Sequence, residues 1–304
     1  MTRQPILVLG GTGHYGRRIV ENLVARGEPV RVLSRNARAA RTVLGLETEI
    51  VEGDVVSRDS VAKVLEGARA VVVAVSAMNP KTARIRMRIE RDGVLHVIDQ
   101  ASQVGCSRVV YLSGYDVREE FVSAIGVPLE FARPMLDVQV ALSASSLNWT
   151  VLGCAPSMEL FFALIRRSTM IVPGGGPPAL PTISSHDVGK IAAQAVMRHD
   201  LSGRHLRLAG PEAFSFPEAA QRISQVWGKP VRFRAIPLLP LRIASALTRP
   251  FSPYLHLVFC AVNLMNHFPH ELAAQVPSDH RFLRELFDYV PTTLEVEAEH
   301  RHSG

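Results

Sequence analysis

Cysteine is scarce in this sequence of 304 residues. Its three cysteines, Cys106, Cys154 and Cys260, are widely separated and odd in number, and the sequence contains no C-x-x-C pair. This pattern excludes a disulfide framework and the usual cysteine-based zinc sites. We therefore expect reduced, mostly buried thiols, no metal site and a cytoplasmic protein.

A long uninterrupted apolar run is also missing. The most apolar late segment, 254–265, is broken by His256 and Asn263 and is shorter than the ~20 residues that span a bilayer. The chain enters an apolar strand within a few residues of Met1, which leaves no room for a signal peptide. The sequence therefore predicts a soluble protein without a transmembrane segment.

Lysine occurs at only four positions, so the formal net charge of +6 is carried mainly by arginine. The basic residues are dispersed rather than gathered into a stripe with interleaved aromatics, which argues against nucleic-acid binding. One local cluster contains Arg31, Arg35, Arg38 and Arg41, of which the last two are expected on a solvated helix face. The charge balance is consistent with an anionic small-molecule ligand.

Glycines follow the first apolar segment, 6–9, and a helix-like pattern follows the glycines. Gly10, Gly13 and Gly16 form a G-x-x-G-x-x-G pattern directly after the expected strand. Gly10 allows a sharp turn, Gly13 lets the backbone approach a pyrophosphate, and Gly16 lets the helix pack closely on the sheet. This loop predicts a dinucleotide phosphate site.

Further strands are expected at 29–34, 49–53, 70–75, 108–113 and 148–153, with helical patterns between them. This alternation predicts an α/β fold with a Rossmann-type, doubly wound parallel sheet. From about residue 156 the elements become short and a Gly/Pro-rich loop appears at 173–178. We expect an NAD(P)-binding core at 1–155 and a smaller, mostly helical substrate lobe at 156–304, which returns one strand and one helix to the core.

The end of the second strand bears on the choice of nucleotide. An NAD-selective site places an acidic side chain there, whereas this chain has Ser34-Arg35-Asn36. A guanidinium forms charge-assisted hydrogen bonds to a 2′-phosphate, so NADP(H) is the preferred cofactor and NAD(H) the alternative. Asp54 is expected to accept a hydrogen bond from the adenine amino group, or else to cap the helix that begins near Ser57.

The residues expected to contact the dinucleotide follow the first, second, third, fourth and sixth strands. They are Gly10, Thr12, Gly13, His14, Tyr15, Gly16, Ser34, Arg35, Asp54, Val55, Ala74, Val75, Ser76 and Pro156.

Ordered motifs accompany the glycine loop along residues 4–236. They include 30–36, 52–54, 70–75, 105–113, 146–152, 183–189, 208–212 and 216–220. As a set they resemble the NmrA-like atypical short-chain dehydrogenase/reductases. The resemblance implies a Rossmann fold and NAD(P)H binding. It also implies either reduction of quinones, dyes or aromatic ethers, or a regulator that binds the dinucleotide without chemistry.

The sequence departs from this family at the proton donor. The reductases use a tyrosine with a lysine four residues later, or a lone lysine before the sixth strand. No Y-x-x-x-K occurs here, and Met135 stands where the lysine is expected. Methionine cannot donate a proton. Ser113 and Tyr115, just past the fifth strand, are the remaining candidates, with local backbone hydrogen bonding as their alternative role.

Four other features have simpler structural interpretations. Ser185 or Asp187 is expected to cap a helix at 188–198 rather than to form a catalytic pair with His186. Pro269 separates His267 from His270, which argues against a zinc motif. The apolar segment 236–268 is expected to form the lobe core, with a substrate cover or a partner surface as alternatives. The charged tail, 295–304, is expected to fray.

These observations favour an NADPH-dependent oxidoreductase that reduces a small hydrophobic carbonyl, quinone or related acceptor. The alternative is a non-catalytic NAD(P) sensor or scaffold that acts through a protein partner. We expect a monomer or a homodimer.

Overall fold

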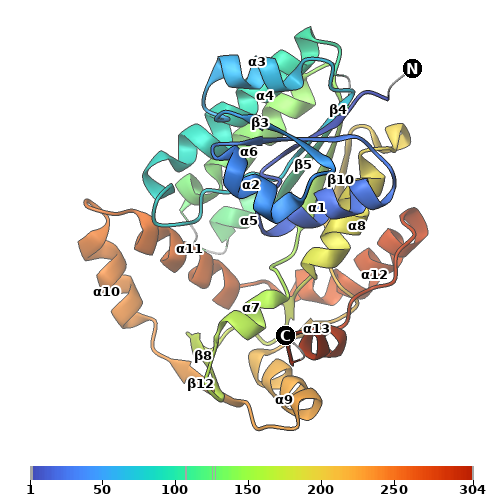
Figure 1. Cartoon of the computed structure of the whole chain (residues 1–304). Coiled ribbons are helices and arrows are strands. Elements are labelled where there is room, and N and C mark those ends of the chain that lie inside the picture. The colour runs from blue at the N-terminus through green and yellow to red at the C-terminus, as the bar shows by residue number, and fades with distance from the viewer. Residues whose placement is uncertain (1–2, 107, 125, 127, 303–304) are drawn as a thin grey trace.

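A seven-stranded parallel sheet is the centre of the structure, a computed structural model that describes residues 3–106, 108–124, 126 and 128–302. Ser107, part of one family motif, lies outside the described residues. The strand order is β10-β6-β5-β4-β1-β2-β3, and all six pairings are parallel (Figure 1). The strands are β1 (Ile6–Leu9), β2 (Val30–Ser34), β3 (Thr48–Glu52), β4 (Ala70–Val73), β5 (Arg108–Gly114), β6 (Asn148–Cys154) and β10 (Arg204–Leu208). The predicted Rossmann-type fold is confirmed.

Helices cover both faces of this sheet, which explains why its strands are continuous apolar runs rather than alternating ones. Along β1, Val8 packs into the core beneath one face and Leu7 and Leu9 into the core beneath the other. One face carries α1 (His14–Ala25), α2 (Ala37–Leu44) and α8 (Ser185–Ala195). The other carries α3 (Arg58–Leu65), α4 (Gly93–Gln103) and α6 (Leu129–Ala144), with a π-helical turn, Arg88–Asp92, leading into α4.

Shorter elements follow β6. They are α7 (Glu159–Ala163), a three-stranded sheet of β7 (Ile165–Arg166), β8 (Thr169–Pro173) and β12 (Arg232–Ile236), the pair β9 (Leu180–Pro181) and β11 (Ala213–Phe214), and the helices α9 (Phe216–Trp227), α10 (Leu239–Thr248), α11 (Tyr254–Asn266), α12 (His270–Leu286) and α13 (Leu294–His302). The connections contain α5 (Glu119–Ala124) and the 3₁₀ turns Ala83–Ile85 and His199–Leu201. One apolar cluster runs from the α1 face into this region, and β10 and α8 belong to the main sheet and its cover. A domain boundary at 155/156 stays a prediction.

One sequence expectation about the last third of the chain is wrong, and another holds only in part. The tail does not fray up to His302, because Leu294 and Ala298 of α13 are fully buried and Trp227 Nε1 donates to the Ala298 carbonyl at 2.9 Å. Segment 236–268 is only partly core, since α11 buries Leu257 and Cys260 whereas α10 leaves Leu239, Ile243 and Leu247 exposed. The three thiols are buried and free, as expected.

Among the residues that the structure describes, no helix has both the length and the apolar character needed to cross a bilayer.

Candidate functional site

The loop between β1 and α1 has the geometry that its glycines predict. Gly10 adopts φ +78°, and a Cβ there would collide with the Ala74 carbonyl at the end of β4. A Cβ on Gly16 would collide with the Gly10 carbonyl, so Gly16 packs the helix against the loop itself. Gly13 has ordinary extended backbone, and its added Cβ would meet only the Gly10 carbonyl oxygen, at 3.1 Å. The space beyond Gly13 belongs to a cavity.

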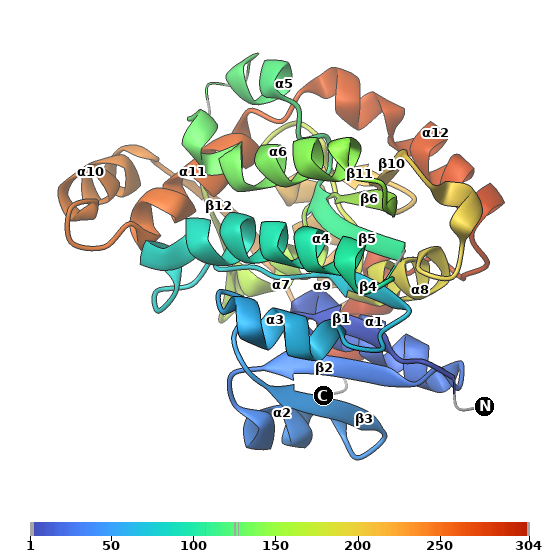
Figure 2. The same ribbon diagram turned by 90° about the horizontal axis from the view of Figure 1, so that it is seen from above.

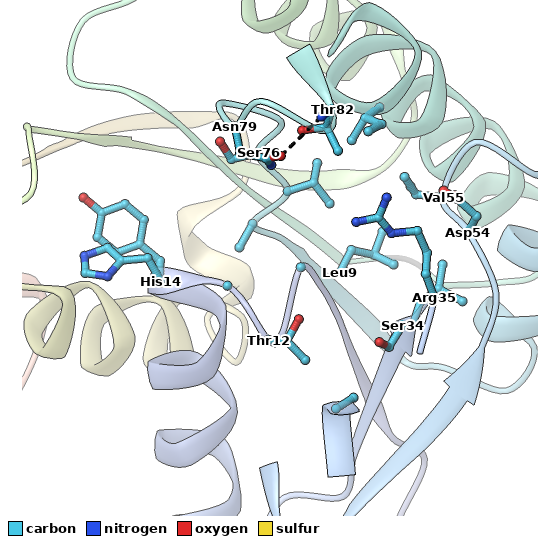
Figure 3. Close-up of a pocket in the computed structure, with 18 of the residues that line it drawn as sticks. Leu9, Thr12, His14, Ser34, Arg35, Asp54, Val55, Ser76, Asn79 and Thr82 are labelled. Carbon is cyan, nitrogen blue, oxygen red and sulfur yellow. Dashed lines mark hydrogen bonds between the residues drawn. The ribbon is translucent and has the colours of Figure 1, made fainter. Parts of the chain in front are cut away.

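This cavity has a volume of about 720 Å³ and follows the carboxyl ends of β1, β2, β3 and β4 (Figure 3). A crevice at this edge of a doubly wound sheet is where such folds bind ligands. Of the residues singled out in the sequence, those that line it are Gly10, Thr12, Gly13, His14, Tyr15, Ser34, Arg35, Asp54, Val55, Ala74, Val75 and Ser76. Within the described part of the chain, Gly16 and Pro156 are not in the lining, although Ser157 is.

The N-terminus of α1 faces the cavity, and no acidic side chain of the helix's own first turn neutralises it. Gly13 is the N-cap residue, no described side chain caps the helix, and its first turn contains no acidic residue. Amides at a helix N-terminus attract negative charge, and the backbone here is accessible because Gly13 has no side chain. The loop therefore fits a phosphate or pyrophosphate.

Arg35 provides a second positive feature, at the end of β2. Figure 3 shows its side chain extending into the cavity, and it has no hydrogen-bond or ion-pair partner among the described residues. Its neighbours are engaged: Asn36 caps α2 by accepting from Ala39 N at 2.9 Å, and Ser34 Oγ donates to the Asn36 carbonyl at 3.1 Å. Arg35 is therefore free to bind an anionic ligand.

Asp54 does not cap α3, so the capping role that the sequence analysis gives as its alternative is wrong. Ser57 is the cap and accepts from Ser60 N at 3.3 Å, whereas Asp54 Oδ1 accepts from Val56 N at 3.2 Å. The remaining carboxylate oxygen of Asp54 is available at the cavity wall.

Sequence reasoning missed part of the wall. The additional lining residues are Leu9, Leu33, Asn36, Ala39, Ala40, Val43, Gly53, Met78, Asn79, Thr82, Ile89 and Ser157. Several come from the segment after β4, which carries no motif. This segment is fixed by internal contacts: Glu90 Oε1 accepts from Ala77 N at 2.7 Å, and Thr82 donates to the Ala77 carbonyl at 2.9 Å.

A polar network forms the end of the cavity opposite Arg35 and Asp54 (Figure 3). His14 Nε2 lies 2.9 Å from Ser157 Oγ and 3.6 Å from Glu159 Oε2. Ser157 also donates to Glu159, and Glu159 accepts from both the amide and the hydroxyl of Ser185. Burial alone would raise the pKa of the Glu159 carboxyl, but the hydrogen bonds from His14, Ser157 and Ser185 outweigh it and hold the pKa well below its ordinary value. Glu159 is thus a buried carboxylate that orients His14 through Ser157.

Replacing Glu159 with glutamine is expected to lower the free energy of unfolding by about 2 kcal/mol near neutral pH, because charge-assisted hydrogen bonds are lost. The folded pKa lies below the unfolded one, so the stabilisation is complete above the unfolded value of 4.5 and declines as the pH falls below it. Urea unfolding at several pH values should therefore show a difference in the free energy of unfolding between wild type and Glu159→Gln, and this difference should become smaller in acid. Glu21→Gln, at an exposed pair with Arg18, is the control and should have little effect. If this difference in unfolding free energy stays constant in acid, Glu159 is not a charged carboxylate in the folded protein.

The two proton-donor candidates from the sequence lie outside this lining. Tyr115 Oη donates to Asp279 of α12 at 2.5 Å, and burial followed by this hydrogen bond raises its pKa far above the ordinary value. Ser113 is nearly buried, with Gln139 Nε2 at 3.4 Å. Met135 lies near Gly114, where it offers a thioether and no proton. A catalytic role for Ser113 or Tyr115 stays a prediction.

The phenol that does reach the cavity belongs to Tyr15. Burial, followed by the nearby Cys154 and Glu159, raises its pKa well above the ordinary value, so it stays protonated.

Neither remaining histidine motif forms a site. Ser184 caps α8 by accepting from His186 N at 3.2 Å, so the cap predicted at Ser185 or Asp187 is wrong by one or more positions. Asp187 instead accepts from the Thr292 amide and hydroxyl, at 2.7 and 2.8 Å. Across the described residues, no group of three or more His, Cys, Asp or Glu side chains is arranged to hold a metal.

Comparison with known proteins identifies the family of this chain. A family profile for NAD(P)H-binding matches residues 10–199. A photosystem II assembly factor, Ycf39 of Synechocystis, is 25% identical over 255 residues, covering 81% of this chain and 74% of the relative. A (4-alkanoyl-5-oxo-2,5-dihydrofuran-3-yl)methyl phosphate reductase of Streptomyces griseus is 28% identical over 249 residues, covering 81% of this chain and 82% of the relative.

Among solved structures, the NADPH complex of the quinone oxidoreductase QOR2 from Escherichia coli superposes with a TM-score of 0.72. The sequence identity is 18%, and the match covers 97% of this chain and 99% of that one. This similarity shows the shared fold, and the profile match covers well over half of the chain. The chain therefore belongs to the NAD(P)H-binding family whose profile it matches.

Proposed function

We propose that this protein is an NADPH-dependent reductase of a small hydrophobic carbonyl, quinone or related acceptor. The observation that carries the proposal is the continuity of one cavity. It joins a phosphate-accepting loop and a free arginine to an imidazole that is oriented by a buried carboxylate. A site that only senses a nucleotide has no need of a polarised imidazole at the far end.

Each part of the cavity has a role in this proposal. Gly10 and Gly13 admit the pyrophosphate to the N-terminus of α1, and Arg35 binds the 2′-phosphate. Asp54 accepts from the adenine amino group. Val55, Leu33 and the residues after β4 enclose the apolar parts of the cofactor. When bound, NADPH supplies the hydride for a two-electron reduction, and a proton from the protein completes the conversion of a carbonyl to an alcohol or of a quinone to a hydroquinone.

The geometry favours His14 as the source of this proton. Its side chain is 42% exposed at the cavity, whereas Glu159 behind it is almost fully buried. The Glu159 carboxylate lies 3.6 Å from His14 Nε2, and Ser157 fixes the ring by its hydrogen bond to Nε2. The imidazole ring of His14 is thus exposed to the cavity on one side and lies beside the Glu159 carboxylate on the other. Neither Ser113 nor Tyr115 has this arrangement.

Stopped-flow oxidation of bound NADPH with a panel of quinones, aldehydes and enones tests the proposal. We expect acceptor-dependent oxidation. His14→Gln should lower turnover about 100-fold, the low end for a general acid, while NADPH affinity measured separately stays near that of wild type. Ser157→Ala should lower turnover by less, because it removes the hydrogen bond that holds the His14 imidazole but leaves the imidazole in place.

Tyr115→Phe is the matched control, since it removes a hydroxyl that is already bound to Asp279. If Tyr115→Phe loses turnover and His14→Gln keeps it, the proton comes from Tyr115 instead.

The alternative is a non-catalytic NAD(P) sensor that acts through a protein partner. Met135 in place of the expected lysine favours it, as does the similarity to an assembly factor. If the saturated protein oxidises NADPH with no acceptor of the panel, the reductase proposal fails. A partner whose affinity changes with the bound nucleotide would then support the sensor.

A further inference from the structure

Four large apolar side chains form a ridge on α10 and the turn that follows it. Leu239, Ile243, Leu247 and Phe251 are 60%, 50%, 70% and 75% exposed. Residues four positions apart lie on one face of a helix with about 3.6 residues per turn, so Leu239, Ile243 and Leu247 make one continuous stripe, and Phe251 extends it. We call these four residues the apolar ridge. Contiguous exposed apolar surface of this kind marks an interaction site.

The ridge has no partner within the described chain. Its helix packs on α11 through the opposite face, where Ser245 is 3% exposed and its hydroxyl lies 3.2 Å from His256 Nδ1. Figures 1 and 2 both show α10 at the outer end of the α10–α11 hairpin, which projects from the rest of the molecule. The ridge therefore protrudes from the molecule, and only its first residue, Leu239, also lines a cavity beside α11 among the described residues.

The chain segment that carries the ridge has charge of one sign. Between Glu218 and Glu271 the sequence contains no acidic residue but six basic ones, Arg222, Lys229, Arg232, Arg234, Arg242 and Arg249. Arg242 and Arg249 are exposed on α10 and at its C-terminus. Arg84 contributes another cation, because its guanidinium donates to the Phe251 carbonyl. The partner of this surface must accept protruding apolar side chains and offer negative charge.

We propose that the apolar ridge docks the protein on the surface of an anionic phospholipid bilayer. A bilayer accepts a convex row of Leu, Ile and Phe side chains at the acyl boundary, while its phosphates attract the flanking arginines. A second copy of the chain fits less well, because it would bring the same positive charge against itself. The proposal concerns a helix that lies in the interface and is independent of the acceptor that the cavity reduces.

Vesicle flotation with the full chain tests this proposal. The probes are vesicles of phosphatidylcholine alone and vesicles in which about one third of the lipid is phosphatidylglycerol. We expect at least about tenfold stronger partition onto the anionic vesicles, weakened when salt is raised from ~0.1 M to ~1 M.

Two variants separate the contributions of the ridge. Leu247→Ser with Phe251→Ser removes apolar contact, and Arg242→Gln with Arg249→Gln removes charge. Each pair should weaken partition about tenfold or more while NADPH affinity stays unchanged. Leu46→Ser with Val290→Ser is the matched control, because these side chains are 87% and 78% exposed on other elements and should not contribute.

Equal partition of wild type and both ridge variants would overturn the proposal. So would the absence of vesicle binding together with a concentration-dependent dimer, or a complex with an acidic protein, that the ridge variants abolish. Unchanged NADPH affinity in the variants keeps this result separate from the outcome for the proposed reductase.

Discussion

Replacing Gly13 with valine is expected to abolish binding of both NADPH and NADH while leaving the protein folded. The backbone at Gly13 has φ −78°, which any residue adopts, and a Cβ there meets only one carbonyl oxygen, at 3.1 Å. The rest of the valine side chain would project into the cavity, over the N-terminus of α1. Because a pyrophosphate must approach this backbone closely, we expect a loss of affinity of more than about 100-fold, measured by calorimetric titration.

Ala25→Val is the matched control for Gly13→Val. It adds the same side chain to the exposed far end of the same helix and should leave nucleotide affinity unchanged. Thermal unfolding of both variants establishes that they fold. A folded Gly13→Val protein that binds NADPH like wild type would place the phosphates elsewhere. Gly16 is unsuitable for this test, because a side chain there would collide with the Gly10 carbonyl and disturb the loop itself.

The parts that the sequence predicts well are those in which local backbone geometry and periodicity act together. The strand β1 has the predicted bounds and α1 follows the glycines as expected, because a fully apolar strand, a glycine turn and an amphipathic helix are each determined within a few residues. The end of β2 could be located in the same way, and with it Arg35.

The network behind His14 could not be predicted, because it depends on contacts across the chain. His14 and Ser157 are 143 positions apart, and Glu159 meets Ser185 from 26 positions away. The partner of Tyr115 could not be predicted for the same reason. Its place after β5 suggests a proton donor at the cofactor, but its hydroxyl donates to Asp279, which is 164 positions later in the sequence. The apolar composition of 236–268 suggested burial, yet composition does not tell which face of α10 packs.

Replacing Arg35 with alanine is expected to weaken NADPH binding about 10- to 100-fold and to leave NADH binding nearly unchanged. Arg35 has no partner among the described residues, so its guanidinium can give planar, charge-assisted hydrogen bonds to a 2′-phosphate, worth about 1.5–3 kcal/mol. The nearby Glu52 accepts from Ala37 N at 3.1 Å, so its negative charge is held at the N-terminus of α2. NADH lacks the phosphate and serves as the internal reference.

Arg38→Ala is the control that separates a direct contact from the general field of the protein. Arg38 is exposed on α2 and outside the cavity lining, and its removal lowers the net charge by the same amount. If Arg35 binds the 2′-phosphate directly, only Arg35→Ala changes the ratio of NADPH to NADH affinity in calorimetric titrations. Equal losses for the two nucleotides in Arg35→Ala, or equal effects of Arg35→Ala and Arg38→Ala on NADPH, would mean that the arginine acts through long-range attraction alone. Long-range attraction would also weaken sharply with added salt, whereas a desolvated bidentate contact at the end of β2 would keep most of its selectivity.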